Sequence, residues 1–77
     1  MTYEALTQLL QEGYGWTPIE SRNKYMYSYR REDTQERLNY YYSTGTFTIQ
    51  GPHGSFEKWP GVFTFDDVET ALISHNK

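Results

Sequence analysis

His53 and His75 are the residues of this chain whose type best suits acid–base chemistry. His53 lies in a Gly-Pro-His-Gly segment (51–54), and His75 lies near the end of a predicted helix. General-base and nucleophilic catalysis require a partner that orients the histidine, and the sequence spacing supplies none. Asp66 and Asp67 lie at the start of the same helix, where the helix dipole favours anions, so we interpret them as structural. We therefore predict no catalytic residue and no enzyme, and a hydrolase or nuclease using His53 is the least favoured alternative.

Metal and phosphate chemistry are also disfavoured by the residue types. The chain contains no cysteine, and its two histidines are distant in sequence. A transition-metal site would then need clustered carboxylates, which the sequence pattern does not provide. Neither the segment 12–15 nor the segment 51–54 is a phosphate-binding loop, because neither is followed by the required lysine and helix. We predict no metal, no cofactor and no disulfide.

The length and composition limit the class of protein. A chain of 77 residues is enough for one small domain, and we predict a single domain over residues 1–77. The net charge of −3 disfavours nucleic acid as a partner, although a local basic surface remains open. The sequence lacks both an apolar run of roughly 18 residues and a signal-peptide pattern. We therefore expect a cytoplasmic protein without membrane binding, and the sequence does not predict the oligomeric state.

Helical periodicity occurs at both ends of the chain. Thr2 and Gly13 are suited to cap the first predicted helix at its N- and C-termini. Its apolar stripe consists of Tyr3, Leu6, Leu9 and Leu10. The second predicted helix covers residues 64–75, with Thr64 as its N-cap. Its stripe consists of Phe65, Val68, Leu72 and His75. Each helix is thus expected to bury one side.

Alternation with a period of two predicts three strands between these helices, over residues 24–31, 36–42 and 46–50. The flanking segments 14–23 and 51–61 contain glycine and proline and are interpreted as a connector and a loop. The predicted fold is α+β with α-β-β-β-α order. It has a three-stranded antiparallel meander and two helices packed on one face.

The pairing of the strands tests this arrangement. With turns centred on residues 33–34 and 44–45, Tyr40 lies opposite Tyr27 in the first hairpin and opposite Ile49 in the second. Both hairpins then place the apolar side chains on one face, and a slip of one residue in either would scatter them. The expected core face consists of Tyr25, Tyr27, Tyr29, Leu38, Tyr40, Tyr42, Phe47 and Ile49.

The opposite face of the sheet is the predicted binding surface. Arg30 and Arg37 lie opposite each other there, and opposed like charges are easiest to accommodate in water or around a shared anion. Tyr41 is the aromatic residue of this face, and tyrosine and arginine are enriched at interface hot spots. A merely solvated face is the alternative interpretation. The predicted binding residues here are Arg30, Arg37, Asn39, Tyr41, Thr48 and Gln50.

A second candidate surface is the segment 55–63, which contains Phe56, Trp59 and Phe63. We expect these aromatic side chains to fold back over the core. If Trp59 is exposed instead, it becomes a further binding residue.

The first function hypothesis is a small non-enzymatic interaction module with an accessory or inhibitor role. It would bind another protein through the open sheet face, a sheet edge or the Trp59 loop. The alternative is an RNA or single-stranded nucleic-acid-binding αβββα domain that uses Tyr41, Arg30 and Arg37. The acidic balance of the chain disfavours this alternative.

The predicted element order is similar to that of double-stranded-RNA-binding domains and of small HicA-type toxins. The chain departs from both families in its motifs. Residues 64–67 read Thr-Phe-Asp-Asp where the RNA-binding family has a lysine-rich helix start. That family also has a Gly-Pro-x-His element in its first hairpin, whereas the Gly-Pro-His-Gly segment of this chain (51–54) follows the third predicted strand. Residues 23–25 occupy the region where the toxins have a first-strand histidine. No functional residue is transferred from either family.

Overall fold

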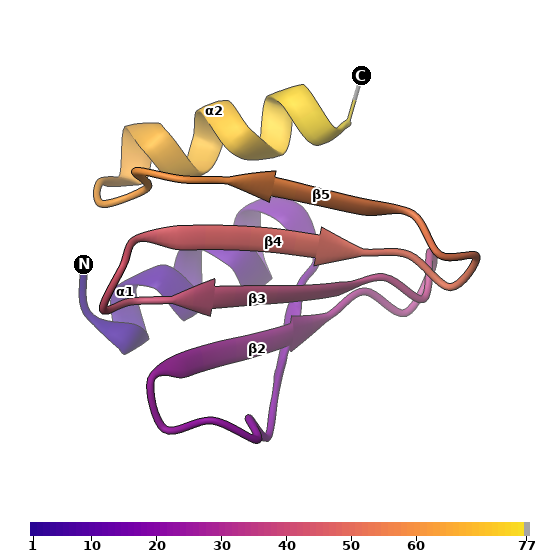
Figure 1. Ribbon diagram of the computed structural model, residues 1–77, viewed down its shortest axis with the longest axis horizontal. Helices are drawn as coiled ribbons and strands as arrows, with labels where there is room; N and C mark the ends of the chain where they lie inside the picture. Colours follow the sequence, from indigo (N-terminus) through magenta and orange to yellow (C-terminus); the bar gives the residue numbers. More distant parts are fainter. Residues whose placement is uncertain (77) are drawn as a thin grey trace.

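The computed structural model describes residues 1–76, which form helices at both ends of the chain and strands between them (Figure 1). The helix α1 (Tyr3–Gln8) continues into a turn of π-helix, η1 (Leu9–Gly13), and α2 (Phe65–His75) follows the last strand. The strands are β1 (Thr17–Ile19), β2 (Met26–Arg30), β3 (Arg37–Tyr41), β4 (Thr46–Gln50) and β5 (Phe56–Trp59). The predicted mixture of helices and antiparallel strands is confirmed, and the sheet is larger than predicted.

All five strands form one antiparallel sheet in the order β1-β2-β3-β4-β5. The prediction of a three-stranded meander is wrong in strand number, because the predicted connector and the predicted loop each contribute an edge strand. β1 has Pro18 at its centre and pairs with β2, and β5 pairs with β4. Short length and proline are features of edge strands. Neither segment has the alternating pattern of a half-buried strand, so periodicity alone misses both.

The register of the first predicted hairpin is confirmed, and that of the second is shifted. Tyr27 of β2 lies opposite Tyr40 of β3, as predicted. Between β3 and β4, Tyr40 lies opposite Phe47 and not Ile49, which is a shift of two residues. The turn is longer than the tight turn assumed, since residues 42–45 all lie between the paired ends of the strands. Because side chains alternate with a period of two, this shift keeps every side chain on its predicted face.

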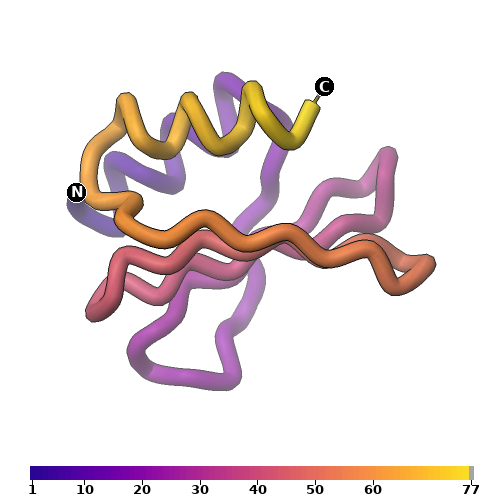
Figure 2. Tube along the Cα trace, turned by 45° about the horizontal axis from the view of Figure 1, so that its top comes forward, coloured from indigo at the N-terminus to yellow at the C-terminus, as the bar shows by residue number. Residues whose placement is uncertain are grey.

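Both helices lie on one face of the sheet, and the connector between β1 and β2 lies on the other side (Figure 2). The predicted arrangement of two helices over one face is therefore confirmed. Within residues 1–76, neither helix has the length and apolar character needed to cross a membrane.

The helix starts follow the predicted caps. Thr2 Oγ1 accepts a hydrogen bond from the amide of Ala5 at 3.1 Å. At α2, Thr64 and Asp67 form a capping box, in which the Thr64 amide donates to Asp67 Oδ2 at 3.1 Å. Hydrogen bonds from backbone amides and the Thr64 side chain hold the pKa of Asp67 below its usual range. The predicted C-cap is wrong, because Gly15 and not Gly13 adopts the left-handed conformation, with φ of 76°.

The core lies between the helices and the sheet. Trp16, which precedes β1, is buried in this core. The other large buried side chains are Leu6, Leu10, Tyr29, Leu38, Tyr40, Phe47, Ile49, Val62, Val68 and Leu72.

The expected core face is correct at its centre and wrong at one end. Tyr25 and Tyr42 are 49% and 38% exposed. They extend the buried row to the surface, where the rings of Tyr42 and Tyr27 stack at 4.8 Å between centroids. Tyr3 contacts Tyr27 edge-on, also at 4.8 Å. These tyrosines therefore form an exposed aromatic cluster at the edge of the core.

Candidate interaction surface on the open sheet face

The face of the sheet opposite the helices presents its side chains in rows that cross the strands. One row crosses all five strands and consists of Thr17, Arg30, Arg37, Gln50 and Phe56. The next row consists of Ile19, Ser28, Asn39, Thr48 and Lys58. A third consists of Met26, Tyr41 and Thr46. The strand positions of this face thus carry three cations, Arg30, Arg37 and Lys58, and no carboxylate.

Arg30 and Arg37 lie directly opposite each other on β2 and β3. Arg30 Nη2 donates to Gln35 Oε1 at 2.6 Å. Gln35 occupies the turn before β3 in a left-handed conformation, with φ of 59°. Arg37 is exposed, and no ion pair among residues 1–76 includes it. One guanidinium is therefore held by a neighbour, and the other can bind an anion from outside.

Two shallow hollows flank Arg37 and Gln50, which line both of them. The hollow beside the β1–β2 connector has a volume of about 190 Å³, and Glu20, Arg22 and Ser28 are among its lining residues. The hollow at the other side has a volume of about 260 Å³ and extends to Pro52. Arg37 therefore stands between two depressions that could receive side chains of a partner.

The centre of the face is polar and already bonded. Ser28 and Thr48 are each 6% exposed although they point away from the helices. Ser28 Oγ donates to Asn39 Oδ1 at 2.9 Å, and Thr48 Oγ1 donates to the Asn39 carbonyl at 3.5 Å. Thr48 is thus buried, and Asn39 is oriented by its neighbour. These bonds stabilise the sheet beneath the arginines.

The aromatic residues of the face lie at its margins. Tyr41 is half-buried between Met26 and Thr46, at the opposite end of β3 from Arg37. Phe56 is 60% exposed and pairs with Gln50 in the arginine row. The prediction that Phe56 folds back over the core is wrong, because the pairing of β5 with β4 places Phe56 on the open face. The sequence near Phe56 does not by itself place this residue on the open face, because its position follows from the pairing of β5 with β4.

Trp59 lies on the helix-covered side of the sheet. It is half-buried, with its ring edge-on to Phe47 at 6.2 Å and to His75 at 6.1 Å between centroids. The expectation of folding back over the core is confirmed for Trp59 and wrong for Phe63, which is 55% exposed, as it is for Phe56. The structure brings six of the seven predicted binding residues together on one face and leaves Trp59 apart from them.

His75 has partners that the sequence did not reveal. Its Nδ1 lies 2.6 Å from Glu57 Oε1, and its Nε2 lies 2.7 Å from Glu36 Oε2. An imidazolium can donate to both carboxylates at once, whereas a neutral ring has only one N–H. The three residues connect the end of α2 with β5 and with the residue before β3. This arrangement joins the helix to the sheet, and sequence spacing could not show it because the residues are far apart in the chain.

The remaining acid–base candidate is His53. His53 is exposed in the turn between β4 and β5, and no ion pair among residues 1–76 includes it. Among the same residues, no group of three or more histidine, aspartate or glutamate side chains could hold a metal ion.

Comparisons of this chain with protein-family models, with curated proteins and with solved structures find no match. The functional argument therefore depends on the geometry of the chain's own residues.

Proposed function

We propose that this chain is a small non-enzymatic interaction module, with an accessory or inhibitor role, that binds another protein on its open sheet face. The observation that carries the proposal is the row that includes Arg30, Arg37 and Phe56. It combines paired cations, an exposed aromatic ring and hollows on either side of Arg37. Arginine and aromatic side chains are the residue types enriched at interface hot spots. The same proposal places the protein in the cytoplasm.

The charge of the face supports an acidic segment as the partner's contact. Its strand positions carry only positive charges, and Arg37 has no carboxylate partner among residues 1–76. A partner carboxylate near Arg37 would form a charge-assisted hydrogen bond and relieve the repulsion from Arg30. The sheet edge is less suited to binding at β1, since that strand is three residues long and contains Pro18.

The test is a comparison of baits in native host lysate. We expect the wild-type chain to retain a specific protein that Arg37→Glu loses, because the substitution reverses the charge that faces the partner. The substitution also places a carboxylate opposite Arg30, so the sheet keeps a favourable cross-strand pair. Lys24→Glu is the matched control, since it makes the same charge change at an exposed residue of the connector. Equal retention by all three baits, or retention of no protein by the wild type, would contradict the proposal.

A nucleic-acid-binding role is the second candidate, and the same cationic row favours it. Tyr41 could stack on a base while Arg37 contacts a phosphate. These residues are four positions apart on β3, or about 13 Å along the strand. Binding of labelled single-stranded RNA or DNA should then fall steeply with added salt and weaken in Tyr41→Ala with Arg37→Ala. Absence of any complex at low salt removes this candidate.

A further inference from the structure

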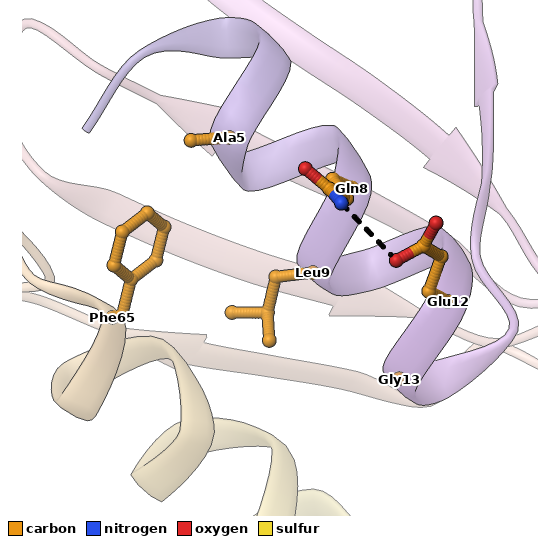
Figure 3. A pocket seen from close by; sticks show the side chains of 6 residues that line it. All are labelled: Ala5, Gln8, Leu9, Glu12, Gly13 and Phe65. Atoms are coloured by element: carbon orange, nitrogen blue, oxygen red, sulfur yellow. Dashed lines mark hydrogen bonds between the residues drawn. The ribbon is translucent and has the colours of Figure 1, made fainter.

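A groove of about 540 Å³ lies between the two helices, on the opposite side of the molecule from the open sheet face (Figure 3). Figure 3 shows Phe65 of α2 pointing into it from one side and Leu9 from the other. Ala5, Gln8, Glu12 and Gly13 complete its lining. The groove therefore has an apolar floor formed by both helices.

Phe65 is the residue that makes this groove unusual. The sequence predicts it in the buried stripe of its helix, yet it is 41% exposed. Its ring lies in the groove and not in the core, because the core below α2 is filled by Val68, Ala71 and Leu72. Ile73 of the same helix is 56% exposed as well. Apolar surface thus remains uncovered on the helical layer.

A carboxylate lines this apolar floor on the α1 side, and a second lies on the same stripe of α2 as Phe65. On the α1 side, Glu12 lines the groove, where its Oε2 accepts a hydrogen bond from Gln8 Nε2 at 3.3 Å. Glu4 precedes Gln8 by four residues, so it lies one turn away on the same stripe. On the α2 side, Glu69 follows Phe65 by four residues in the same way. An occupant of the groove would therefore meet the carboxylate of Glu12 and would lie within one helical turn of Glu69.

This charge is a property of the whole helical layer. Residues 1–16 and 63–76 contain no lysine or arginine, and their acidic residues are Glu4, Glu12, Asp66, Asp67 and Glu69. A second copy that docked through its own helices would bring these carboxylates together, and like charges at an interface oppose association. Charge complementarity therefore selects a cationic occupant.

We infer that the groove between α1 and α2 binds a cationic amphipathic helix of a partner protein. The apolar side of such a helix would cover Phe65 and Leu9, and its lysines or arginines would face Glu12 and Glu69. Helix-in-groove recognition uses apolar side chains at helical spacing as its main contacts. The 11 residues of α2 extend about 16 Å, which matches roughly three turns of a bound helix. This site lies on the other side of the molecule from the proposed partner surface and selects the opposite charge.

The test uses a labelled synthetic amphipathic peptide, about four turns long, with leucines on one face and lysines on both flanks. Fluorescence anisotropy at low salt should show binding of this peptide to the full chain. A matched peptide with glutamates in place of the lysines should not bind. Absence of binding by the lysine peptide, or equal binding of both peptides, would overturn the inference.

Substitutions in the groove test whether the peptide binds there. Glu12→Lys should weaken lysine-peptide binding by about fivefold or more, because it turns an attraction into a repulsion. Phe65→Ser should weaken it by about fivefold or more, because it removes the main apolar contact. Glu32→Lys and Tyr25→Ser are the matched controls, since they make the same charge change and a comparable loss of an aromatic ring at exposed residues outside the groove lining. They should change binding by less than about twofold.

Folding and self-association are measured on the same samples. Far-UV circular dichroism and the thermal midpoint of Phe65→Ser and Glu12→Lys show that lost binding is not lost structure. If either variant unfolds, Phe65→Gln and Glu12→Gln replace them with the same expected direction. Unchanged binding in folded groove variants overturns the inference. Concentration-dependent dimerisation of the wild type that Phe65→Ser abolishes also overturns it, because the occupant is then a second copy.

Discussion

Gly45 lies in the turn between β3 and β4, where its backbone is left-handed with φ of 68°. Its carbonyl accepts a hydrogen bond from the Val62 amide at 2.8 Å, which ties the turn to the segment before α2. The ring of Phe63 lies directly over it, and a Cβ built at Gly45 would come within 2.5 Å of that ring. Only glycine therefore satisfies both the backbone conformation and the close approach of Phe63.

Gly45→Ala should destabilise the fold by about 1–3 kcal/mol, from left-handed strain and displacement of the exposed Phe63 ring. The matched control is Gly54→Ala, where φ is 85° but no atom lies within 4 Å of the new Cβ. It should lose about 1 kcal/mol from strain alone. Urea unfolding measures both.

A double-mutant cycle separates the two causes at Gly45. In a Phe63→Ala background, Gly45→Ala should cost no more than Gly54→Ala, because the ring is gone. An equal cost of Gly45→Ala in both backgrounds would show that Phe63 contributes nothing at this turn.

At the scale of the elements, the C-terminal end of α2 is held to the sheet by the bonds of His75 to Glu36 and Glu57. The side chains of His75 and Glu36 are 12% and 15% exposed, whereas that of Glu57 is 46% exposed. The bond to Glu36 therefore lies in the drier environment, where removal of one partner leaves a poorly solvated charge. The bond to Glu57 is open to water and contributes less.

His75→Gln should lower the free energy of unfolding by roughly 1–2 kcal/mol, because glutamine lacks the two opposed ring nitrogens that contact Glu36 and Glu57. Glu57→Gln should cost less than about 1 kcal/mol, since its partner keeps the bond to Glu36. Denaturant titration at neutral pH measures both changes. A cost of His75→Gln no larger than the roughly 0.5 kcal/mol of an ordinary surface substitution would show that the bridge does not hold α2.

The elements also show how far sequence patterns reach. Thr2 and Thr64 start their helices as predicted, because capping is decided by residues within one turn. The clear alternation of side chains in β2, β3 and β4 predicts these strands, whereas the sequence pattern does not predict β1 and β5. Edge strands gain their hydrogen bonds from a neighbouring strand and need no alternation of their own. The bridge of His75 and the position of Phe56 both depend on β5, so neither could be predicted without it.

At the scale of the whole molecule, the helical layer and the sheet differ in charge and in the chemistry of their surfaces. The helical segments 1–16 and 63–76 contain five acidic residues and no lysine or arginine, whereas Arg22, Lys24, Arg30, Arg31, Arg37 and Lys58 all lie between them in sequence. A net charge of −3 conceals this separation. The two surfaces can therefore attract partners of opposite charge.

The tyrosines of the core make the free energy of unfolding depend on pH in the alkaline range. Burial raises the pKa of Tyr29 to about 12, and burial also raises the pKa values of Tyr27 and Tyr40. The folded state then holds these protons more tightly than the unfolded chain, in which tyrosine ionises near pH 10. Their contribution to stability is fully present below about pH 10 and is lost as the pH rises toward about 12.

We expect the free energy of unfolding to fall steeply above about pH 10, with Tyr29 alone contributing up to roughly 1.4 kcal/mol per pH unit. Tyr29→Phe should be less stable at neutral pH, because it loses the 2.9 Å hydrogen bond between Tyr29 and Thr7. It should also show a shallower alkaline decline. Tyr25→Phe, at an exposed tyrosine, is the control and should keep the wild-type slope. Identical slopes for Tyr29→Phe and the wild type would contradict this account.

The sequence by itself determined the helix starts, the three central strands, the face on which each side chain of those strands lies and the opposition of Arg30 to Arg37. The helix starts depend on neighbours within a few residues. The faces of the strands depend on the alternation of side chains, which a two-residue shift in strand register leaves unchanged. Only the tertiary structure decided that Tyr25 and Tyr42 reach the surface and that Phe56 joins the arginine row. It also decided that His75 bridges two glutamates and that the side chain of Phe65 lines a groove between the helices. Those outcomes depend on which distant segments meet, because burial, ion pairing and surface charge arise from contacts between elements.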